Sequence, residues 1–375
     1  MRFPGFQEDW EVKKLGELLE FKNGINASKE QYGKGVKFIN VLDILNNDFV
    51  TYANIVGKVD VDSHIIEKFS VQYGDVLFQR SSETREEVGT ANVYLDEQKN
   101  ATFGGFVIRG RKIGDYEPIF FNNLLKTDSA RESITTKSGG STRFNVGQDV
   151  LSSIALYFAS LEEQKKISTF LTVINSRIQT QKKIIEVFKT FKVQTRKKLI
   201  VKIIKEDYEP LLIKEILNYE QPTKYIVLNT DYSDDKALTP VLTANKSFIL
   251  GYAEDNFGVY NKGNCIILDD FTMDLKYVNF PFKVKSSAIK ILTAKDEINL
   301  KFVFEYFSFL NFSSNEHKRH YISEIEKMSI VLPKTEVQNN IARFLTALDE
   351  KINLEIDLLN QYELQKRYLL SNLFV

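Results

Sequence analysis

Two long segments of the sequence carry apolar residues at helical spacing. In residues 161–200 the apolar positions recur at steps of three and four, and they do so again in residues 335–374. Such steps place the side chains on one face of a helix, as in the seam of a coiled coil. Neither segment contains Gly or Pro, so each predicts one uninterrupted helix of roughly 60 Å.

These two segments are copies of one repeat. At a constant offset of 174, Glu162 matches Glu336 and Gln164 matches Gln338, and Phe170-Leu171-Thr172 matches Phe344-Leu345-Thr346. A long helix must bury its apolar stripe, and the nearest complementary surface is the other copy. Because the chain leaves along one helix and returns along the other, the repeat predicts antiparallel packing. The alternative is a core-facing helix in an ordinary bundle.

The stripes supply the residues expected to form the coiled coil or to dock a partner protein. They are Ile167, Phe170, Leu171, Ile174, Ile178, Ile341, Phe344, Leu345, Leu348 and Ile352.

The regions before the two helices mix short strand-like runs with turns. Such runs lie at residues 36–41, 75–78, 106–109, 225–228 and 265–268, and helical stretches are expected at 118–136 and 297–311. Residues 1–160 and 205–334 do not resemble each other beyond their edges. The predicted class is α+β. Two globular heads with twisted, mainly antiparallel sheets are separated by two antiparallel helices, with an approximate two-fold relation.

The expected division has four segments. Residues 1–158 form a first head, 159–204 a first spacer helix, 205–333 a second head and 334–375 a second spacer helix.

Four loops gather polar and basic residues. Hydroxyls, bare amides and cationic side chains can approach phosphates, and Arg and Lys can also read guanine edges. Any one of these loops could equally be an ordinary solvated loop. The candidate DNA-contacting residues are Arg80, Ser81, Ser82, Thr84, Arg85, Lys137, Ser141, Thr142, Arg143, Lys283, Lys285, Ser286, Lys318, Arg319, His320 and Tyr321.

Composition limits the classes of protein that fit. The chain has 375 residues, with 50 basic and 50 acidic side chains, which argues against indiscriminate coating of nucleic acid. A single cysteine, Cys265, allows no internal disulfide, and three histidines without a metal-binding spacing predict no metal site. No apolar run is long enough to span a bilayer, and no signal peptide pattern opens the chain. We therefore expect a cytoplasmic protein without a membrane partner.

The alternation of unlike heads with like helices resembles the specificity subunit of type I restriction–modification systems. The matching motifs include Leu15-Gly16-Glu17 after Trp10, Gly74-Asp75-Val76-Leu77-Phe78 and the loop Gly139-Gly140-Ser141-Thr142-Arg143. The helix entries Leu161-Glu162-Glu163-Gln164 and Glu336-Val337-Gln338 match most strongly. Two positions depart from the family pattern: Ala159-Ser160 stands where Pro333 stands in the second half, and the second head opens without the Trp.

The resemblance implies a protein that recognises DNA without a catalytic residue of its own. Each head would be a target recognition domain that reads half of a bipartite double-stranded DNA sequence. The helices would set the gap and dock two methyltransferase subunits. Those subunits would bind S-adenosylmethionine, and two motor-nuclease subunits would bind ATP with Mg²⁺.

Two rival functions remain open. One is a coiled-coil protein–protein scaffold with two binding heads and no DNA role. The other is a nuclease that uses an acidic cluster such as Asp269-Asp270 with Asp274. The sequence contains no G-x-x-x-x-G-K-[ST] phosphate-binding loop, because Gly33-Lys34-Gly35 lacks both the spacing and the hydroxyl. No cofactor is therefore expected on this chain.

Overall fold

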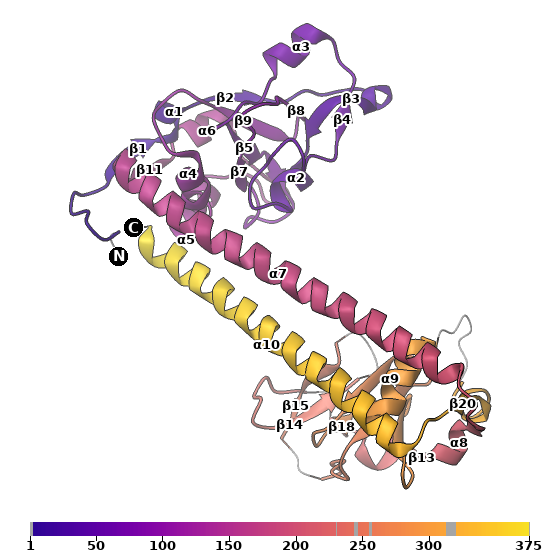
Figure 1. The fold of residues 1–375 in the computed structure, drawn as a ribbon. Helices are drawn as coiled ribbons and strands as arrows, with labels where there is room; N and C mark the ends of the chain where they lie inside the picture. The colour runs from indigo at the N-terminus through magenta and orange to yellow at the C-terminus, as the bar shows by residue number, and fades with distance from the viewer. Residues whose placement is uncertain (1–2, 230, 244–246, 255–256, 313–319, 375) are drawn as a thin grey trace. The chain divides into compact units, whose positions relative to one another are not determined.

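The computed structural model describes residues 3–229, 231–243, 247–254, 257–312 and 320–374. The chain divides into two compact units, one of residues 1–180 with 359–375 and the other of residues 181–358. Each unit combines one head with parts of two long helices, α7 (Leu161–Ile204) and α10 (Thr335–Leu373) (Figure 1). Because the unit boundaries fall inside these helices, the four-segment division stays a prediction.

The first unit contains two main sheets and two short strand pairs. A four-stranded antiparallel sheet has the order β2 (Leu19–Asn23), β9 (Val107–Lys112), β5 (Val76–Gln79), β7 (Ala91–Val93). A three-stranded sheet has the order β4 (Lys58–Val59), β3 (Tyr32–Ile39), β8 (Thr102–Phe103). The short antiparallel pairs are β1 (Glu11–Lys14) with β11 (Ala155–Phe158), and β6 (Ser81–Ser82) with β10 (Phe144–Asn145).

The second unit repeats this arrangement. Its four-stranded antiparallel sheet has the order β13 (Leu217–Glu220), β19 (Ile289–Ala294), β16 (Cys265–Asp269), β17 (Leu275–Val278). Its three-stranded sheet has the order β15 (Ile249–Ala253), β14 (Thr239–Leu242), β18 (Lys283–Val284). A short antiparallel pair joins β12 (Pro210–Leu212) and β20 (Ser329–Val331).

The two heads therefore share one topology, although their sequences correspond only at the edges. In both three-stranded sheets the central strand pairs antiparallel with one neighbour and parallel with the other. The sequences hide this likeness because a strand requires only apolar alternation and a partner, and many residues satisfy both.

Short helices complete the heads. Those of the first unit are α1 (Leu15–Leu18), α2 (Val41–Leu45), α3 (Ser63–Lys68), α4 (Pro118–Leu124), α5 (Asp128–Thr135) and α6 (Gln148–Ser152), with the 3₁₀ turn η1 (Lys29–Gln31). Those of the second are α8 (Ile213–Ile216) and α9 (Leu300–Leu310), with the 3₁₀ turns η2 (Pro222–Tyr225) and η3 (Ile325–Lys327).

Most expected elements form, and one does not. The helices predicted at 118–136 and 297–311 appear as α4 with α5 and as α9. The strand predicted at 225–228 is wrong. Pro222 begins a 3₁₀ turn there, Ile226 makes a single parallel bridge to Val284, and Leu228 is 93% exposed.

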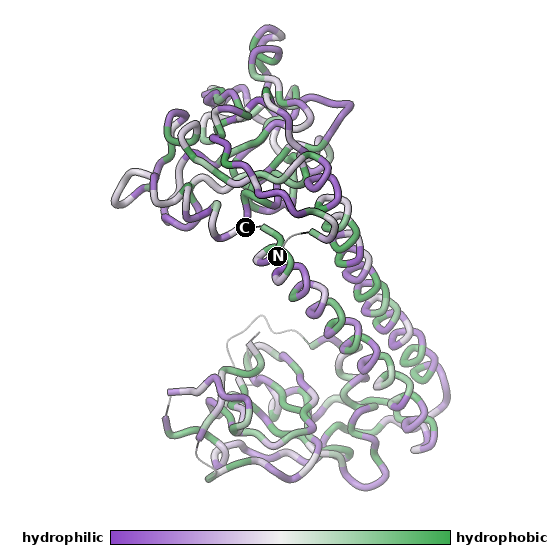
Figure 2. Tube along the Cα trace, turned by 90° about the vertical axis from the view of Figure 1, so that its left-hand side faces the viewer, coloured by the Kyte–Doolittle hydropathy of each residue, from purple (hydrophilic) through white to green (hydrophobic). Residues whose placement is uncertain are grey.

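The two long helices pack side by side and antiparallel within each unit, as predicted. In the second unit Gln181 Nε2 donates to the Glu355 backbone carbonyl at 2.9 Å, and the Lys351 ammonium lies 5.8 Å from the centre of the Phe188 ring. In the first unit Leu171 shares a core with Leu373. Figure 2 shows apolar and polar segments alternating along both helices.

The start of each long helix packs on its own head as well as on the other helix. Ile167 and Leu171 are buried in a core with Phe120 of α4, whereas Ile341 and Leu345 are buried in a core that includes Phe302 of α9. The predicted seam is thus shared between the coiled coil and the two heads.

A repeated glutamine joins each head to the long helix after it. Gln164 accepts a hydrogen bond from Glu117 N at 2.9 Å and donates to Ala159 O at 2.8 Å. Gln338 makes the same pair of bonds, with Asn299 N at 3.0 Å and Pro333 O at 2.8 Å. These matching bonds align α4 with α9 and the start of α7 with the start of α10, residue by residue.

Candidate nucleic-acid interface

The two predicted loops of the first head meet at one edge. The pairing of β6 with β10 sets Asn145 opposite Ser81, and Val146 N donates to Arg80 O at 3.0 Å. Two backbone bonds between Gly139 and Asn145, of 3.0 and 2.8 Å, close the second loop. Gly140 has a φ of +118°, and a Cβ there would lie 2.1 Å from Arg143 O, so only glycine fits this closure.

Exposed cations and an aromatic ring lie along this edge. The Arg143 guanidinium lies 5.8 Å from the centre of the Phe106 ring, which is 61% exposed. Arg80 Nη1 donates to Gly105 O at 3.4 Å, and Arg85 Nε donates to Thr135 O at 3.2 Å. These bonds occupy only part of each guanidinium, which carries five N–H donors. The remaining donors can reach phosphates or base edges.

Most of the other residues predicted in these loops are also accessible. Those classed as exposed are Arg80, Thr84, Arg85, Lys137, Ser141, Thr142 and Arg143, and Ser81 is partly exposed. Ser82 is the exception. Its side chain is buried, it donates to Glu87 Oε2 at 2.9 Å and it accepts from Thr84 N. We therefore assign Ser82 to the loop's internal structure.

A second group of cations in the first head was not predicted from the sequence. Lys22 on β2 lies opposite Arg109 on β9 in the strand register, and Arg111 comes next on the same face. Both arginines donate to Ser70 O, and Lys22 Nζ lies 4.8 Å from the centre of the Phe69 ring. Burial, with the charges of Arg109 and Lys68, lowers the pKa of Lys22.

The sequence does contain a signal for this group of cations, because Arg109 and Arg111 alternate along the strand Val107–Lys112. A period of two marks one face of a strand. Because both side chains bond to Ser70, they shape the surface and raise its positive potential. Of these four cations Lys68 is exposed, Lys22 and Arg111 are partly exposed, and Arg109 is buried.

The corresponding edge of the second head is built differently. Arg80 N donates to Phe106 O at 2.9 Å, and Asp270 N donates to Ala288 O at 3.0 Å. These matching bonds place Asp270 where the first head has Arg80. Asp270 is 1% exposed, and its Oδ1 accepts from His320 N and Tyr321 N at 2.9 and 2.7 Å. A buried carboxylate thus stands where the first head exposes a guanidinium.

Three predicted contacts of the second head are corrected by burial. Lys283 is 2% exposed, and its ammonium donates to Phe257 O at 2.7 Å. His320 is 5% exposed, with Nδ1 3.1 Å from Glu324 Oε2, and Tyr321 is 1% exposed. Burial leaves these three side chains too little surface for a contact with DNA.

The remaining predicted residues of this head are divided. Lys285 and Ser286 are exposed, whereas Lys318 and Arg319 lie outside the described residues.

The acidic cluster of the second head is occupied by its own chain. Asp269 Oδ1 accepts from Phe271 N and Thr272 N at 2.7 and 2.9 Å, and Asp270 Oδ2 lies 3.3 Å from the Lys290 ammonium. Among the described residues no three His, Cys, Asp or Glu side chains are grouped so that they could hold a metal ion. The cluster therefore gives no support to a metal-dependent nuclease.

Two grooves occupy corresponding places beside the long helices. One, of about 310 Å³, lies between the start of α4 and α7, and the other, of about 420 Å³, lies between the start of α9 and α10. Lys165, Thr169 and Thr172 of the first groove correspond to Asn339, Arg343 and Thr346 of the second.

The stripe residues separate into a buried set and an exposed pair. Ile167, Leu171, Ile174, Ile178, Ile341, Leu345 and Ile352 are buried, and Leu348 is partly buried. Phe170 and Phe344, which match at the repeat offset, are 37% and 43% exposed. Apolar rings exposed at the same place in both copies are available to a partner protein.

Comparison with known proteins identifies the family. The family described as "Type I restriction modification DNA specificity domain" matches residues 7–190 and 205–364. The specificity subunit of the Escherichia coli type I restriction enzyme EcoR124I/EcoR124II is 40% identical over 182 residues. That match covers 44% of this chain and 45% of the relative, so it spans about half of the relative's length.

Other similarities extend over nearly the whole chain. The putative type I restriction enzyme MjaX specificity subunit of Methanocaldococcus jannaschii is 24% identical over 97% of this chain and 92% of its own. The crystal structure of a type I restriction–modification S subunit from M. genitalium has the same fold. Its TM-score is 0.63 at 16% identity, over 98% of this chain and 96% of that one. Among the described residues, no helix has the length and apolar character needed to cross a membrane.

Proposed function

This chain belongs to the family of type I restriction–modification DNA specificity domains, and from that premise we propose that it selects the DNA sequence on which such a complex acts. Each head reads one half of a bipartite double-stranded target. The two long helices set the gap between the halves. In this proposal the chain contributes recognition, and partner subunits carry out the catalysis.

The edge where β6 meets β10 carries this proposal. It combines the exposed cations Arg80 and Arg143 with loop hydroxyls and the accessible ring of Phe106. Cations and hydroxyls position a protein on phosphates, and guanidinium groups read guanine in the major groove. The second head presents a different polar surface on the same topology, which suits two unlike half-sites.

The repeated grooves support two identical partners. Grooves lie at corresponding positions beside α7 and α10, and Phe170 and Phe344 are exposed nearby in sequence, so the repeat offers two equivalent places for a partner to dock. We assign these surfaces to two methyltransferase subunits, each of which binds S-adenosylmethionine. Two motor-nuclease subunits, which bind ATP with Mg²⁺, complete the assembly.

Methylation mapping tests the proposed function. The chain is combined with its methyltransferase partner and S-adenosylmethionine, and methylated adenines are located in a random DNA library. We expect one split motif with a constant gap, and Arg143→Ala should relax one half of it only. Methylation without a shared motif, or a motif that is not split, would contradict bipartite recognition.

A salt series distinguishes DNA recognition from a protein–protein scaffold. Binding of labelled duplex DNA by the complex should weaken steeply as salt rises, because each phosphate contact releases counterions. The methyltransferase partner alone is the control. If adding this chain changes neither the affinity nor the salt slope, the scaffold is the better description.

A further inference from the structure

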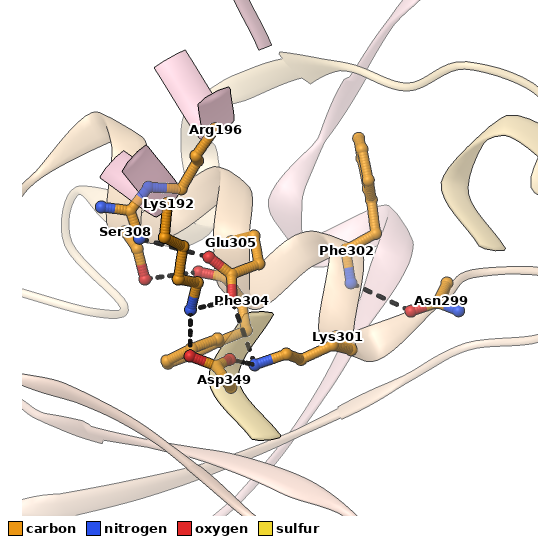
Figure 3. A network of polar contacts seen from close by, with 9 residues as sticks. All are labelled: Lys192, Arg196, Asn299, Lys301, Phe302, Phe304, Glu305, Ser308 and Asp349. Carbon is orange, nitrogen blue, oxygen red and sulfur yellow. Dashed lines mark hydrogen bonds and ion pairs between the residues drawn. The ribbon is translucent and has the colours of Figure 1, made fainter. Parts of the chain in front are cut away.

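Five charged side chains form one network inside the second unit (Figure 3). Glu305 lies at its centre, with Oε1 2.9 Å from Lys192 Nζ and 3.0 Å from Lys301 Nζ, and with Oε2 3.2 Å from Arg196 Nη1. Asp349 joins the same two lysines, at 2.6 Å from Lys192 Nζ and 2.9 Å from Lys301 Nζ.

This network is largely removed from water. The Glu305 side chain is fully buried, and those of Lys192, Lys301 and Arg196 are 13%, 16% and 17% exposed. Burial alone would raise the pKa of Asp349, but hydrogen bonds from Lys192 and Lys301 outweigh it and lower that pKa. A buried ion pair is weakly screened and demands a definite geometry, so it fixes the elements that carry it.

Three elements meet at the network. Lys192 and Arg196 come from α7, Asp349 comes from α10, and Lys301 and Glu305 come from α9. Helix α9 belongs to the head, where Phe302 is buried in the same core as Ile266 of β16. The five charges thus connect the head to both long helices at one point.

The first unit has the same fold without this network. The alignment by Gln164 and Gln338 places uncharged residues at four of the five positions, where Asn123 replaces Glu305 and Asn175 replaces Asp349. The counterparts of Lys301, Glu305, Asp349, Lys192 and Arg196 are, in that order, Ile119, Asn123, Asn175, Lys366 and Leu370. A cavity of about 390 Å³ lies there, lined in part by Ile119, Asn123 and Asn175.

The first unit therefore shows that this head fold forms without the charges. Burying charged side chains costs desolvation free energy, and a protein with apolar residues in place of a buried ion pair is often as stable as the original. Stability alone therefore does not explain the network. In the second unit the charges instead fix the arrangement of the helices, because cations from different helices hold each carboxylate.

We propose that Glu305 and Asp349 are positioning residues that fix the second head on the two spacer helices and so restrict the gap at which its half-site is read. This proposal rests on the proposed DNA function. It assigns gap discrimination to named side chains in the second unit, and it predicts that the corresponding residues of the first unit have no such effect.

The test measures binding of the methyltransferase complex to DNA with the preferred gap and with gaps one base pair shorter and longer. Asp349→Asn removes one carboxylate from the rim of the network, and Glu305→Gln removes the central one. Asn175→Ala, at the counterpart of Asp349, is the matched control. We expect the affinity ratio between preferred and altered gaps to fall about fivefold in Asp349→Asn and to stay at the wild-type value in the control.

Each outcome has a definite meaning. Both half-site sequences should stay the same in Asp349→Asn, because its reading loops are untouched. A variant that is less stable but keeps the wild-type gap ratio overturns the positioning role and leaves the proposed function intact. A wild-type complex without any gap preference overturns the proposed function, and the positioning role with it. If Glu305→Gln does not fold, Asp349→Asn decides the question.

Discussion

Arg143 combines a guanidinium with the exposed ring of Phe106, at the point where two loops of the first head join. An arginine held over an aromatic face keeps its planar donors in one orientation. At the repeat offset of 174, Arg143 corresponds to His317, which lies outside the described residues. Asp270, the counterpart of Arg80, is buried. At this edge the two heads thus present different side chains on a common strand topology.

Replacing Arg143 tests its contact with DNA. In Arg143→Ala the affinity of the complex for target DNA should fall about tenfold, and the salt slope should decrease by about one phosphate contact. Arg143→Lys keeps the charge, so the slope should return while sequence preference stays weakened. Wild-type affinity and slope in Arg143→Ala would contradict the contact.

The lowered pKa of Asp349 predicts a pH dependence of stability. A carboxyl whose folded-state pKa lies below its unfolded value stabilises the protein above that value and loses this effect as the pH falls through the folded pKa. Asp349→Asn should therefore lower the free energy of unfolding by about 1 kcal/mol at pH 7, since the group is partly exposed.

Denaturant unfolding of wild type and Asp349→Asn from pH 7 to pH 2.5, about the range over which such a carboxyl titrates, checks this prediction. The difference between the two proteins should shrink below the ordinary pKa of 3.8. A difference that stays constant with pH would mean that the ionised carboxylate does not contribute.

At the scale of elements, the repeated glutamine explains why the helix entries are alike while the heads differ. Gln164 and Gln338 each satisfy one backbone donor and one backbone acceptor that the fold buries. Glutamine alone offers both functions at this length without charge. The bonds fix the angle between each head's helix and the long helix after it.

Gln338→Ala should destabilise the protein by about 2 kcal/mol, because it leaves the part-buried Asn299 N and the buried Pro333 O without this partner. Thermal and denaturant unfolding measure this loss. Asn340→Ala, on an exposed position of the same helix, is the control and should change stability little. Equal effects of the two substitutions would show that the glutamine bonds are not decisive.

The sequence predicts helices better than it predicts the sheets or the site. The stripe at Ile167, Leu171 and Ile174 is local, so its period reveals the helix directly. The likeness of β3 and β14 depends on which distant strands pair, and no local period records that choice. His320 and Tyr321 have the composition of a surface loop, but the distant Asp270 holds their backbone and buries them.

At the scale of the whole molecule, the proposed function makes the length of α7 a determinant of the target. Inserting four residues between Gln181 and Phe188 would lengthen the helix by about 6 Å and rotate the rest of α7 by about 40°. The preferred gap should grow by one or two base pairs (~3.4 Å each) while both half-site sequences stay unchanged.

Methylation mapping of the insertion variant reads the gap and both half-sites together. The same insertion in a loop of the first head, such as the one at Lys99, is the control and should leave the gap unaltered. An altered half-site with an unaltered gap would refute the role of the helix.

The contact between Gln181 and Glu355 joins two residues that hold the same place in the two copies of the repeat. If both copies were identical in this respect, an amide would face an amide or a carboxylate would face a carboxylate, and two carboxylates repel. Because the two copies carry different residues at this position, the contact between unlike copies differs from a contact between like copies. Each copy of the repeat matches the other copy better than it matches a duplicate of itself, which favours pairing of α7 with α10 over pairing of two identical helices.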